Sequence, residues 1–188
     1  MAGIPLLVVL TGPSAAGKDS LLAHLKSLGR PYHFVETATT RPRRGDERAG
    51  IDYVFVSEEQ FDAMLEAGEL LEHAEVYGHR YGVPRQPVRE ALASGRDALM
   101  RTDVQGARHI KSVVPGTVTI FVTVPSIAEL TTRLLERGSD SKEQAELRMR
   151  IATSEMESAG EFDYMVVNDD LERAVQELSE LAATMCPA

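Results

Sequence analysis

The segment LLVVLTGPSAAGKDS, residues 6–20, limits what this chain can fold into more than any other. Its apolar run at 6–10 leads directly into a loop bounded by Gly12 and Gly17, and Lys18 and the helical pattern LLAHL follow. A strand, a loop and a helix in the pattern G-x-x-x-x-G-K direct backbone N–H groups and a helix N-terminus at phosphate oxygens. The flanking strand and helix favour this interpretation over an ordinary glycine-containing turn. The predicted phosphate loop consists of Gly12, Pro13, Ser14, Ala15, Ala16, Gly17, Lys18, Asp19 and Ser20.

Asp19 departs from the usual pattern, in which Ser or Thr at this position supplies a hydroxyl to Mg²⁺. Mg²⁺ prefers hard oxygen ligands, so a carboxylate is chemically admissible there. Ser20 offers an alternative hydroxyl, but on an α-helix it points about 100° away from the preceding residue. We therefore expect Asp19 to bind Mg²⁺ directly or through water.

Apolar runs at 98–103, 118–124 and 164–167 repeat the pattern of the first strand, and each is followed by a helical segment. This alternation predicts an α/β fold with a doubly wound parallel sheet flanked by helices. Between about 33 and 96 the pattern changes to short alternating strands, with one expected helix at 58–67. We expect this part to be a mixed α+β insertion lying over the phosphate loop, within one domain that spans residues 1–188.

The balance of 20 Lys and Arg against 29 Asp and Glu gives a formal charge of −9. This charge argues against nucleic acid or an anionic membrane as the main partner. No apolar run approaches the length that spans a bilayer. The single cysteine, Cys186, permits no internal disulfide, which fits a reducing compartment. We expect a cytoplasmic protein, and the sequence leaves monomer and homodimer open.

Motifs spread over nearly the whole chain carry a resemblance to a known family. The phosphate loop, TATTRPRRGDERAGIDYVFVS, LLEHAEVYGHRYGVP, TDVQGA and FDYMVVNDD occur in an order and spacing similar to those of guanylate kinases. The resemblance implies transfer of the γ-phosphoryl group of ATP to GMP with Mg²⁺, and it implies that the phosphate loop binds the ATP. It also implies a core at about 1–32 and 97–188, a GMP-binding lobe at about 33–96 and a lid at about 137–150.

The run TTRPRR, residues 39–44, places three guanidinium groups within four residues, and Pro42 keeps the segment out of a helix. A solvated basic turn is the alternative interpretation. Planar bidentate donors in an acidic protein favour a bound phosphate. The resemblance implies that two of these arginines and two tyrosine hydroxyls bind the acceptor phosphate, while Arg43 points outward. The four residues are Arg41, Arg44, Tyr53 and Tyr81.

Glu72 matches the family position whose carboxylate accepts hydrogen bonds from N1–H and N2–H₂ of guanine. Adenine would face the same carboxylate with an acceptor at N1, so the position discriminates between the bases. Without the resemblance, Glu72 reads as an ordinary exposed carboxylate on a strand. Val83 occupies a position where the family commonly has a Ser or Thr hydroxyl for guanine O6. The remaining positions implied for GMP are Thr37, Asp103 and Gly106.

Arg133, Arg137 and Arg148 flank the polar segment 138–142 and resemble the arginines of the lid. Arg133 and Arg137 lie four residues apart, so both can reach a transferring phosphoryl group from one helix face. Pairing with surface carboxylates such as Glu129 is the alternative. We prefer Arg148 to its neighbour Arg150 on spacing.

Two further positions complete the expected site. Asn168 follows the last core strand and matches a family position near the adenine of ATP, although a turn residue at a strand end is the alternative. Arg101 stands where the family often has an acidic residue close to the metal.

Three functions are compatible with these features. The leading one is an ATP:GMP phosphotransferase. A related P-loop kinase with another acceptor is the second, because GKDS also resembles the loop of ribose bisphosphate kinases. The third is a guanylate-kinase-like binding module without catalysis. Retention of Lys18 and the arginines argues against the third, and Glu72 with the two tyrosines argues against the second.

Overall fold

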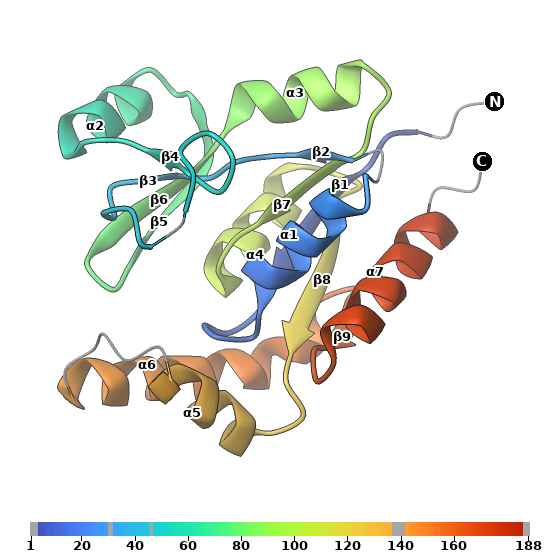
Figure 1. Cartoon of the computed structure of the whole chain (residues 1–188). Coiled ribbons are helices and arrows are strands. Elements are labelled where there is room, and N and C mark those ends of the chain that lie inside the picture. Colours follow the sequence, from blue (N-terminus) through green and yellow to red (C-terminus); the bar gives the residue numbers. More distant parts are fainter. Residues whose placement is uncertain (1–3, 30–31, 46, 137–141, 186–188) are drawn as a thin grey trace.

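The computed structural model describes residues 4–29, 32–45, 47–136 and 142–185, with the side chains at 142–145 and 182–185 excepted (Figure 1). Arg137, the first part of the predicted lid and Cys186 lie outside these ranges. None of the helices in the described ranges is both long enough and apolar enough to cross a membrane.

A five-stranded parallel sheet forms the centre of the molecule, in the order β2-β7-β1-β8-β9. The first strand, LVVLT, is buried at every position, as expected of a parallel strand that is covered on both faces. The four strands predicted for the core are confirmed, and the parallel α/β fold class with them. The five strands are β1 (Leu7–Thr11), β2 (His33–Phe34), β7 (Ala98–Arg101), β8 (Val118–Thr123) and β9 (Tyr164–Val167).

Helices cover both faces of this sheet (Figure 1). Alternate side chains of β1 point to opposite faces: Val8 and Leu10 belong to one buried cluster, while Leu7 and Val9 belong to another. The first cluster includes residues of α1 (Lys18–Ser27) and α7 (Leu171–Met185), and the second includes residues of α3 (Arg85–Ala93) and α4 (Val104–Val113). This packing fixes α1, and with it the phosphate loop, against the sheet.

Residues 38–84 form a second lobe, which lies at the upper left in Figure 1. We call it the β3–β6 lobe. It consists of a mixed four-stranded sheet in the order β4-β3-β6-β5 and the helix α2 (Glu58–Glu66). Ser57 and Gln60 form a capping box at the start of α2. Its strands are β3 (Ala38–Thr39), β4 (Val54–Phe55), β5 (Leu70–Val76) and β6 (His79–Pro84).

The structure corrects two details of the expected insertion. The insertion, expected to begin at about 33, begins later, because β2 pairs with β7 in the core sheet and only β3 belongs to the lobe. A second helix, α3, also lies in this stretch. Pro87 sits in its first turn, where the missing N–H costs little, so Pro87 does not exclude a helix. Val88 and Ala91 then pack into the core, a tertiary contact that the local pattern does not reveal.

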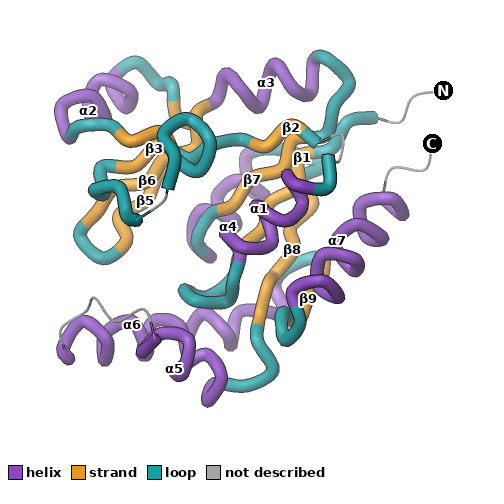
Figure 2. The backbone as a smooth tube through the Cα atoms, in the orientation of Figure 1, coloured by secondary structure: helices purple, strands orange, loops and turns teal. Residues whose placement is uncertain are grey.

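The helices α5 (Ile127–Glu136) and α6 (Lys142–Glu157) form a layer below the sheet, and the short helix η1 (Ser158–Glu161) leads from it to β9 (Figures 1 and 2). Leu130 and Leu134 of α5 pack with Ala152 of α6 in a third buried cluster. Ala15 of the phosphate loop belongs to the same cluster, so this layer supports the loop directly.

Candidate active site

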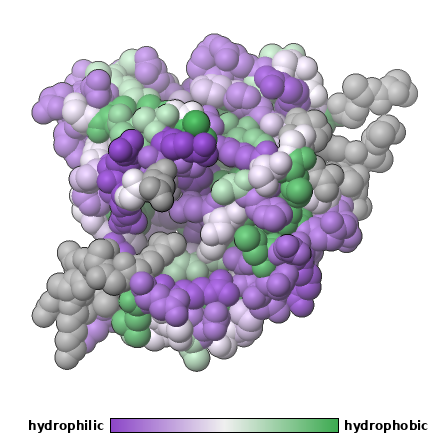
Figure 3. Space-filling view, in the orientation of Figure 1, coloured by the Kyte–Doolittle hydropathy of each residue, from purple (hydrophilic) through white to green (hydrophobic). Residues whose placement is uncertain are grey.

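A cavity of about 270 Å³ lies where the phosphate loop, the carboxyl end of β7, the β3–β6 lobe and α6 meet. The carboxyl ends of parallel strands are where α/β folds bind ligands. Figure 3 shows this face hollowed between the upper lobe and the α5–α6 layer, with hydrophilic residues around the hollow. The predicted site residues that line the cavity are Gly12, Ser14, Ala15, Gly17, Lys18, Asp19, Thr37, Arg41, Arg44, Tyr53, Glu72, Tyr81, Asp103 and Arg148.

The phosphate loop depends on glycine at both of its ends. Gly12 has φ +130°, and a Cβ there would lie 2.0 Å from the carbonyl oxygen of Val122 in β8. Gly17 has φ +90°, and a Cβ there would lie 2.1 Å from Nδ2 of Asn168. Both the backbone conformation and the close packing therefore exclude a side chain.

Lys18 and Asn168 hold the loop in shape. Nζ of Lys18 donates to the carbonyl oxygens of Gly12 at 2.5 Å and of Pro13 at 3.0 Å. The buried amide of Asn168 donates from Nδ2 to the carbonyl oxygen of Ala16 at 2.8 Å. Asn168 thus supports the loop from the end of β9, and this contact gives the residue a structural role that needs no bound nucleotide.

Arg133 lies beside Asn168 and does not line the cavity. Its Nε donates to Oε1 of Glu129 at 2.8 Å, which is the surface pairing that the sequence offered as an alternative. Its Nη2 also donates to the backbone carbonyl of Asn168 at 3.0 Å. The structure therefore connects Arg133 to the phosphate loop through Asn168.

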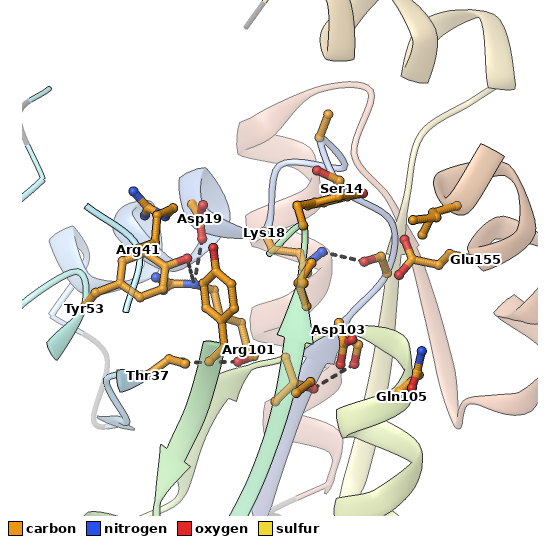
Figure 4. A pocket seen from close by; sticks show the side chains of 18 of the residues that line it. Ser14, Lys18, Asp19, Thr37, Arg41, Tyr53, Arg101, Asp103, Gln105 and Glu155 are labelled. Carbon is orange, nitrogen blue, oxygen red and sulfur yellow. Dashed lines mark hydrogen bonds and ion pairs between the residues drawn. The ribbon is translucent and has the colours of Figure 1, made fainter. Parts of the chain in front are cut away.

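Asp19 and Arg101, two of the three expected departures from the family pattern, form an ion pair with 2.6 Å between Oδ1 and Nε (Figure 4). The side chain of Arg101 is 11% exposed and that of Asp19 is 58% exposed. Arg101 also donates from Nη2 to the carbonyl oxygen of Asp52 at 2.7 Å, and its guanidinium stacks 4.3 Å from the ring centre of Tyr53. This ion pair thus joins the helix that follows the phosphate loop to the end of β7.

Arg41 is almost fully buried and is held by Glu47 in a bidentate ion pair, at 2.8 and 3.1 Å. Burial acts to lower the pKa of Arg41, but Glu47 and Tyr81 together outweigh it, so the pKa is raised. Oε2 of Glu47 also accepts from the backbone N–H of Arg44 at 2.8 Å. Arg44 lines the cavity, and Arg43 is exposed and absent from the lining.

Glu47 was not expected in the site. The motif RRGDE, residues 43–47, carries a signal that could have found it, since a carboxylate shortly after a basic run can fold back on the arginines. The rings of Tyr53 and Tyr81 lie edge to face at 6.3 Å beside Arg41. These side chains form a second cationic group, across the cavity from Lys18 (Figure 4).

Glu72, on β5, is buried rather than exposed, at 6% relative exposure. Burial, with the charge of Asp103 as a further cause, raises the pKa of Glu72 to about 8. Asp103 begins α4 by accepting from the backbone N–H of Gly106 at 2.8 Å. A Cβ on Gly106 would lie 2.6 Å from Oε1 of Glu72, so only glycine leaves room for this carboxylate.

The helix α6 supplies Arg148, Ile151 and Glu155 to the cavity lining, and only Arg148 was expected. Arg148 lines it and stacks 4.6 Å from the ring centre of Tyr77, whereas Arg150 is not part of the lining. Glu155 lies against the phosphate loop, where burial raises its pKa to about 6 while Lys18 and the backbone N–H of Ser14 act to lower it. The local sequence gives no signal for Glu155, because a helix far along the chain brings it there.

Among the described residues, seven predicted site residues do not line the cavity. Val83 is fully buried in the apolar cluster between the sheet and α3–α4. The seven are Pro13, Ala16, Ser20, Val83, Gly106, Arg133 and Asn168.

Among the described residues, no group of three or more His, Cys, Asp or Glu side chains converges in a way that could hold a metal ion. This donor set does not contradict Mg²⁺, which commonly takes one or two carboxylates and completes its shell with water and phosphate oxygens. Asp19 offers one carboxylate to the cavity beside the phosphate loop.

The parallel sheet, and the glycine-bounded loop with Lys18 between β1 and α1, make this chain a nucleotide-binding P-loop protein. A second cationic group across the same cavity points to a P-loop kinase with a phosphorylated acceptor. The sequence profile described as "Guanylate kinase" matches residues 5–184. The chain belongs to the guanylate kinase family.

Individual relatives agree with this assignment. A guanylate kinase of Thermosynechococcus vestitus is 46% identical over 90% of this chain and 88% of the relative. One from Enterococcus faecalis is 42% identical over 95% and 88%, respectively. The crystal structure of guanylate kinase from Anaplasma phagocytophilum superimposes with a TM-score of 0.81 at 29% identity, covering 99% of this chain and 88% of that one.

Proposed function

We propose that this chain transfers the γ-phosphoryl group of ATP to GMP, giving ADP and GDP. The observation that carries the proposal is one cavity with two separate anion sites and a buried carboxylate beyond the second. The phosphate loop with Lys18 forms the first site, and Arg41 with the two tyrosines forms the second. Membership of the guanylate kinase family supports the same assignment.

Phosphoryl transfer requires little covalent chemistry from the protein. It requires that donor and acceptor phosphates lie in line, that their charge is neutralised and that water is excluded. The backbone N–H groups of the loop and Lys18 bind the donor phosphates in this proposal. Arg41 and Arg44, with the hydroxyls of Tyr53 and Tyr81, hold the acceptor phosphate opposite them.

Base selection rests on Glu72 in this proposal, with Thr37 and Asp103 beside it in the cavity. An ionised Glu72 accepts from the N1–H and the 2-amino group of guanine together. AMP would leave the buried carboxylate without donors and place N1 of adenine against it, which disfavours that base. The buried position of Val83 means that O6 of guanine needs another donor from the lining.

We further propose that Mg²⁺ binds with ATP and that Asp19 is its protein ligand. Mg²⁺ held there would neutralise charge on the phosphates of ATP. Replacing Asp19 by Asn should raise the Mg²⁺ concentration needed for ATP binding, whereas Ser20→Ala should not. Calorimetric ATP titrations at several Mg²⁺ concentrations measure this directly, and equal Mg²⁺ dependence in both variants would remove Asp19 as the ligand.

Closure of α5 and α6 over the phosphates is the last element of the proposal. Arg148 already faces the cavity, and Arg133 stands behind the loop. Arg137 is proposed as the third arginine of this group from the sequence alone.

We also propose a cytoplasmic location for the protein, in keeping with its single cysteine.

A coupled assay of ADP release tests the proposed reaction. ATP with Mg²⁺ should be consumed with GMP and dGMP well above AMP, CMP, UMP and ribose bisphosphate. Faster turnover with ribose bisphosphate than with GMP would show that GMP is not the acceptor. No turnover with any acceptor, together with intact ATP and GMP binding, would identify a binding module instead.

A further inference from the structure

Arg101 lies at the end of β7, between the phosphate loop and the β3–β6 lobe. The proposed reaction assigns it no role, and its position departs from the family pattern. Its side chain is only 11% exposed, so its charge must be balanced by groups close to it. Those groups belong to both sides of the cavity.

On the core side, Asp19 of α1 balances the charge, with its Oδ1 at 2.6 Å from Nε of Arg101. On the lobe side, Nη2 of Arg101 donates to the carbonyl oxygen of Asp52 at 2.7 Å. Nε lies 3.4 Å from the hydroxyl oxygen of Tyr53 and donates to it. One guanidinium therefore ties the loop that carries Tyr53 to the helix that follows the phosphate loop.

The contact with Tyr53 orients a phosphate ligand. A phenolic hydroxyl has one proton to donate and lone pairs to accept with. Because Arg101 donates to the oxygen, the proton of Tyr53 remains available to another acceptor. Burial, with the charge of Asp19 as a further cause, raises the pKa of Tyr53, which keeps that proton in place at neutral pH.

Tyr53 is also fixed by a second arginine. The guanidinium of Arg41 lies 5.2 Å from the centre of the Tyr53 ring, and that of Arg101 lies 4.3 Å from it. Cations over an aromatic face are attracted by the ring quadrupole. Two cations and a polar hydroxyl thus converge on the part of the cavity assigned to the acceptor phosphate.

We propose that Arg101 is a positioning residue for the acceptor phosphate: held by Asp19, it fixes Tyr53 so that the tyrosine hydroxyl donates to that phosphate. This inference rests on the proposed function, since it names a further residue for the same acceptor site. It also gives Asp19 and Arg101 a joint role, because Asp19 balances the charge of a buried arginine between the phosphate loop and the β3–β6 lobe.

Binding of GMP and guanosine, compared by calorimetry without ATP or Mg²⁺, tests the proposal. The two ligands differ only in the phosphate. Arg101→Gln should raise the Kd of GMP by roughly tenfold, the scale of losing a charge-assisted contact, and should leave the Kd of guanosine within about twofold. Arg101→Lys should recover part of the loss, because it keeps the charge near Asp19.

A double-mutant cycle shows whether Arg101 acts through Tyr53. In a Tyr53→Phe background, Arg101→Gln should weaken GMP binding by less than about threefold, because the hydroxyl it positions is gone. Arg96→Gln is the matched control, since Arg96 is exposed and its Nε donates to Ser94 Oγ at 3.1 Å, outside the cavity. It should leave both affinities unchanged.

The outcomes separate this inference from the proposed function. A wild-type protein that binds neither GMP nor guanosine would overturn the proposed acceptor. Wild-type binding of GMP with no change in Arg101→Gln would overturn the role of Arg101. Equal loss of GMP and guanosine would also overturn it, by showing that Arg101 only maintains the folded lobe, and so would full additivity with Tyr53→Phe.

Discussion

The phosphate loop and the acceptor side of the cavity bind anions in different ways. The loop is a continuous segment that presents backbone N–H groups, and its shape depends on two glycines, Lys18 and the amide of Asn168. The acceptor side is assembled from side chains of the β3–β6 lobe and β7, and its cations are held by carboxylates. The donors of the loop lie in one continuous segment that Asn168 supports, whereas the acceptor side depends on paired charges brought together by folding.

This contrast predicts that the largest effects come from removing one cation on each side. Lys18→Ala and Arg41→Ala should each lower kcat by at least roughly a hundredfold, because each removes an electrostatic donor to a phosphate. The measurement is steady-state turnover of GMP, with circular dichroism as the check on folding. Arg43→Ala is a matched control for Arg41, since Arg43 is exposed, and it should keep near wild-type turnover.

A second change tests the buried carboxylate on the acceptor side. Glu72→Gln should lower kcat/KM for GMP by roughly five- to a hundredfold, because the amide turns a donor toward guanine. The ratio of kcat/KM values for GMP and AMP should narrow. The same ratio measured in Glu75→Gln is the comparison, because Glu75 lies on the same strand and also lines the cavity. An unchanged ratio in Glu72→Gln would remove that residue from base readout.

The raised pKa of Glu72, about 8, makes the acceptor side sensitive to pH. Only the ionised form accepts from guanine, so GMP affinity should rise by up to roughly fiftyfold, in step with the ionised fraction of Glu72, as the pH increases from 6 to 8. Folding stability should respond in the opposite direction: the carboxyl ionises near its ordinary value when unfolded but near 8 when folded, so stability falls as pH rises between them.

Calorimetry of GMP between pH 6 and 9 measures the first trend, and urea unfolding over the same range measures the second. In the Glu72→Gln variant, GMP affinity and unfolding stability should both depend less on pH. Asp103 and Glu155 also face this cavity, so Glu155→Gln is the control that should leave the GMP trend in place. A trend that survives in Glu72→Gln would assign the titration to another group.

The smallest expected effect concerns the loop, where Gly17→Ala should cost more stability than Gly95→Ala. Both glycines have positive φ, at +90° and +77°, so both substitutions strain the backbone. Only at Gly17 does the new Cβ meet another group, Nδ2 of Asn168. The difference should be on the order of 1–2 kcal/mol in the free energy of unfolding. Equal losses would show that the loop tolerates displacement of Asn168.

Much of the fold could be predicted from the chain alone. The apolar strands and the helices between them specify the parallel sheet, because burial on both faces requires continuous apolar runs. The pattern missed α3, a helix that tertiary packing stabilises, and it missed β2 as a core strand, because the topology sets the partner of β2. The site predictions from motifs place most of their residues around one cavity, and their individual roles remain predictions.

Glu47 and Glu155 show what a sequence motif leaves out. The first follows the arginines closely and carries a local signal, whereas the second reaches the loop from α6, more than a hundred residues away. Such contacts depend on how helices pack, and spacing along the chain does not encode them.

The sequence by itself indicated the phosphate loop, since G-x-x-x-x-G-K after an apolar strand places its glycines, its lysine and its helix start in one continuous segment. It also determined the sheet and the presence of an arginine cluster. The tertiary structure decided which charges meet. It buried Glu72 beside Asp103, turned Val83 into the core, and joined Asp19 to Arg101 across a distance that no motif spans. The physical reason is that a local backbone conformation follows from neighbouring residues, whereas the energy of a buried charge depends on whatever the whole fold places beside it.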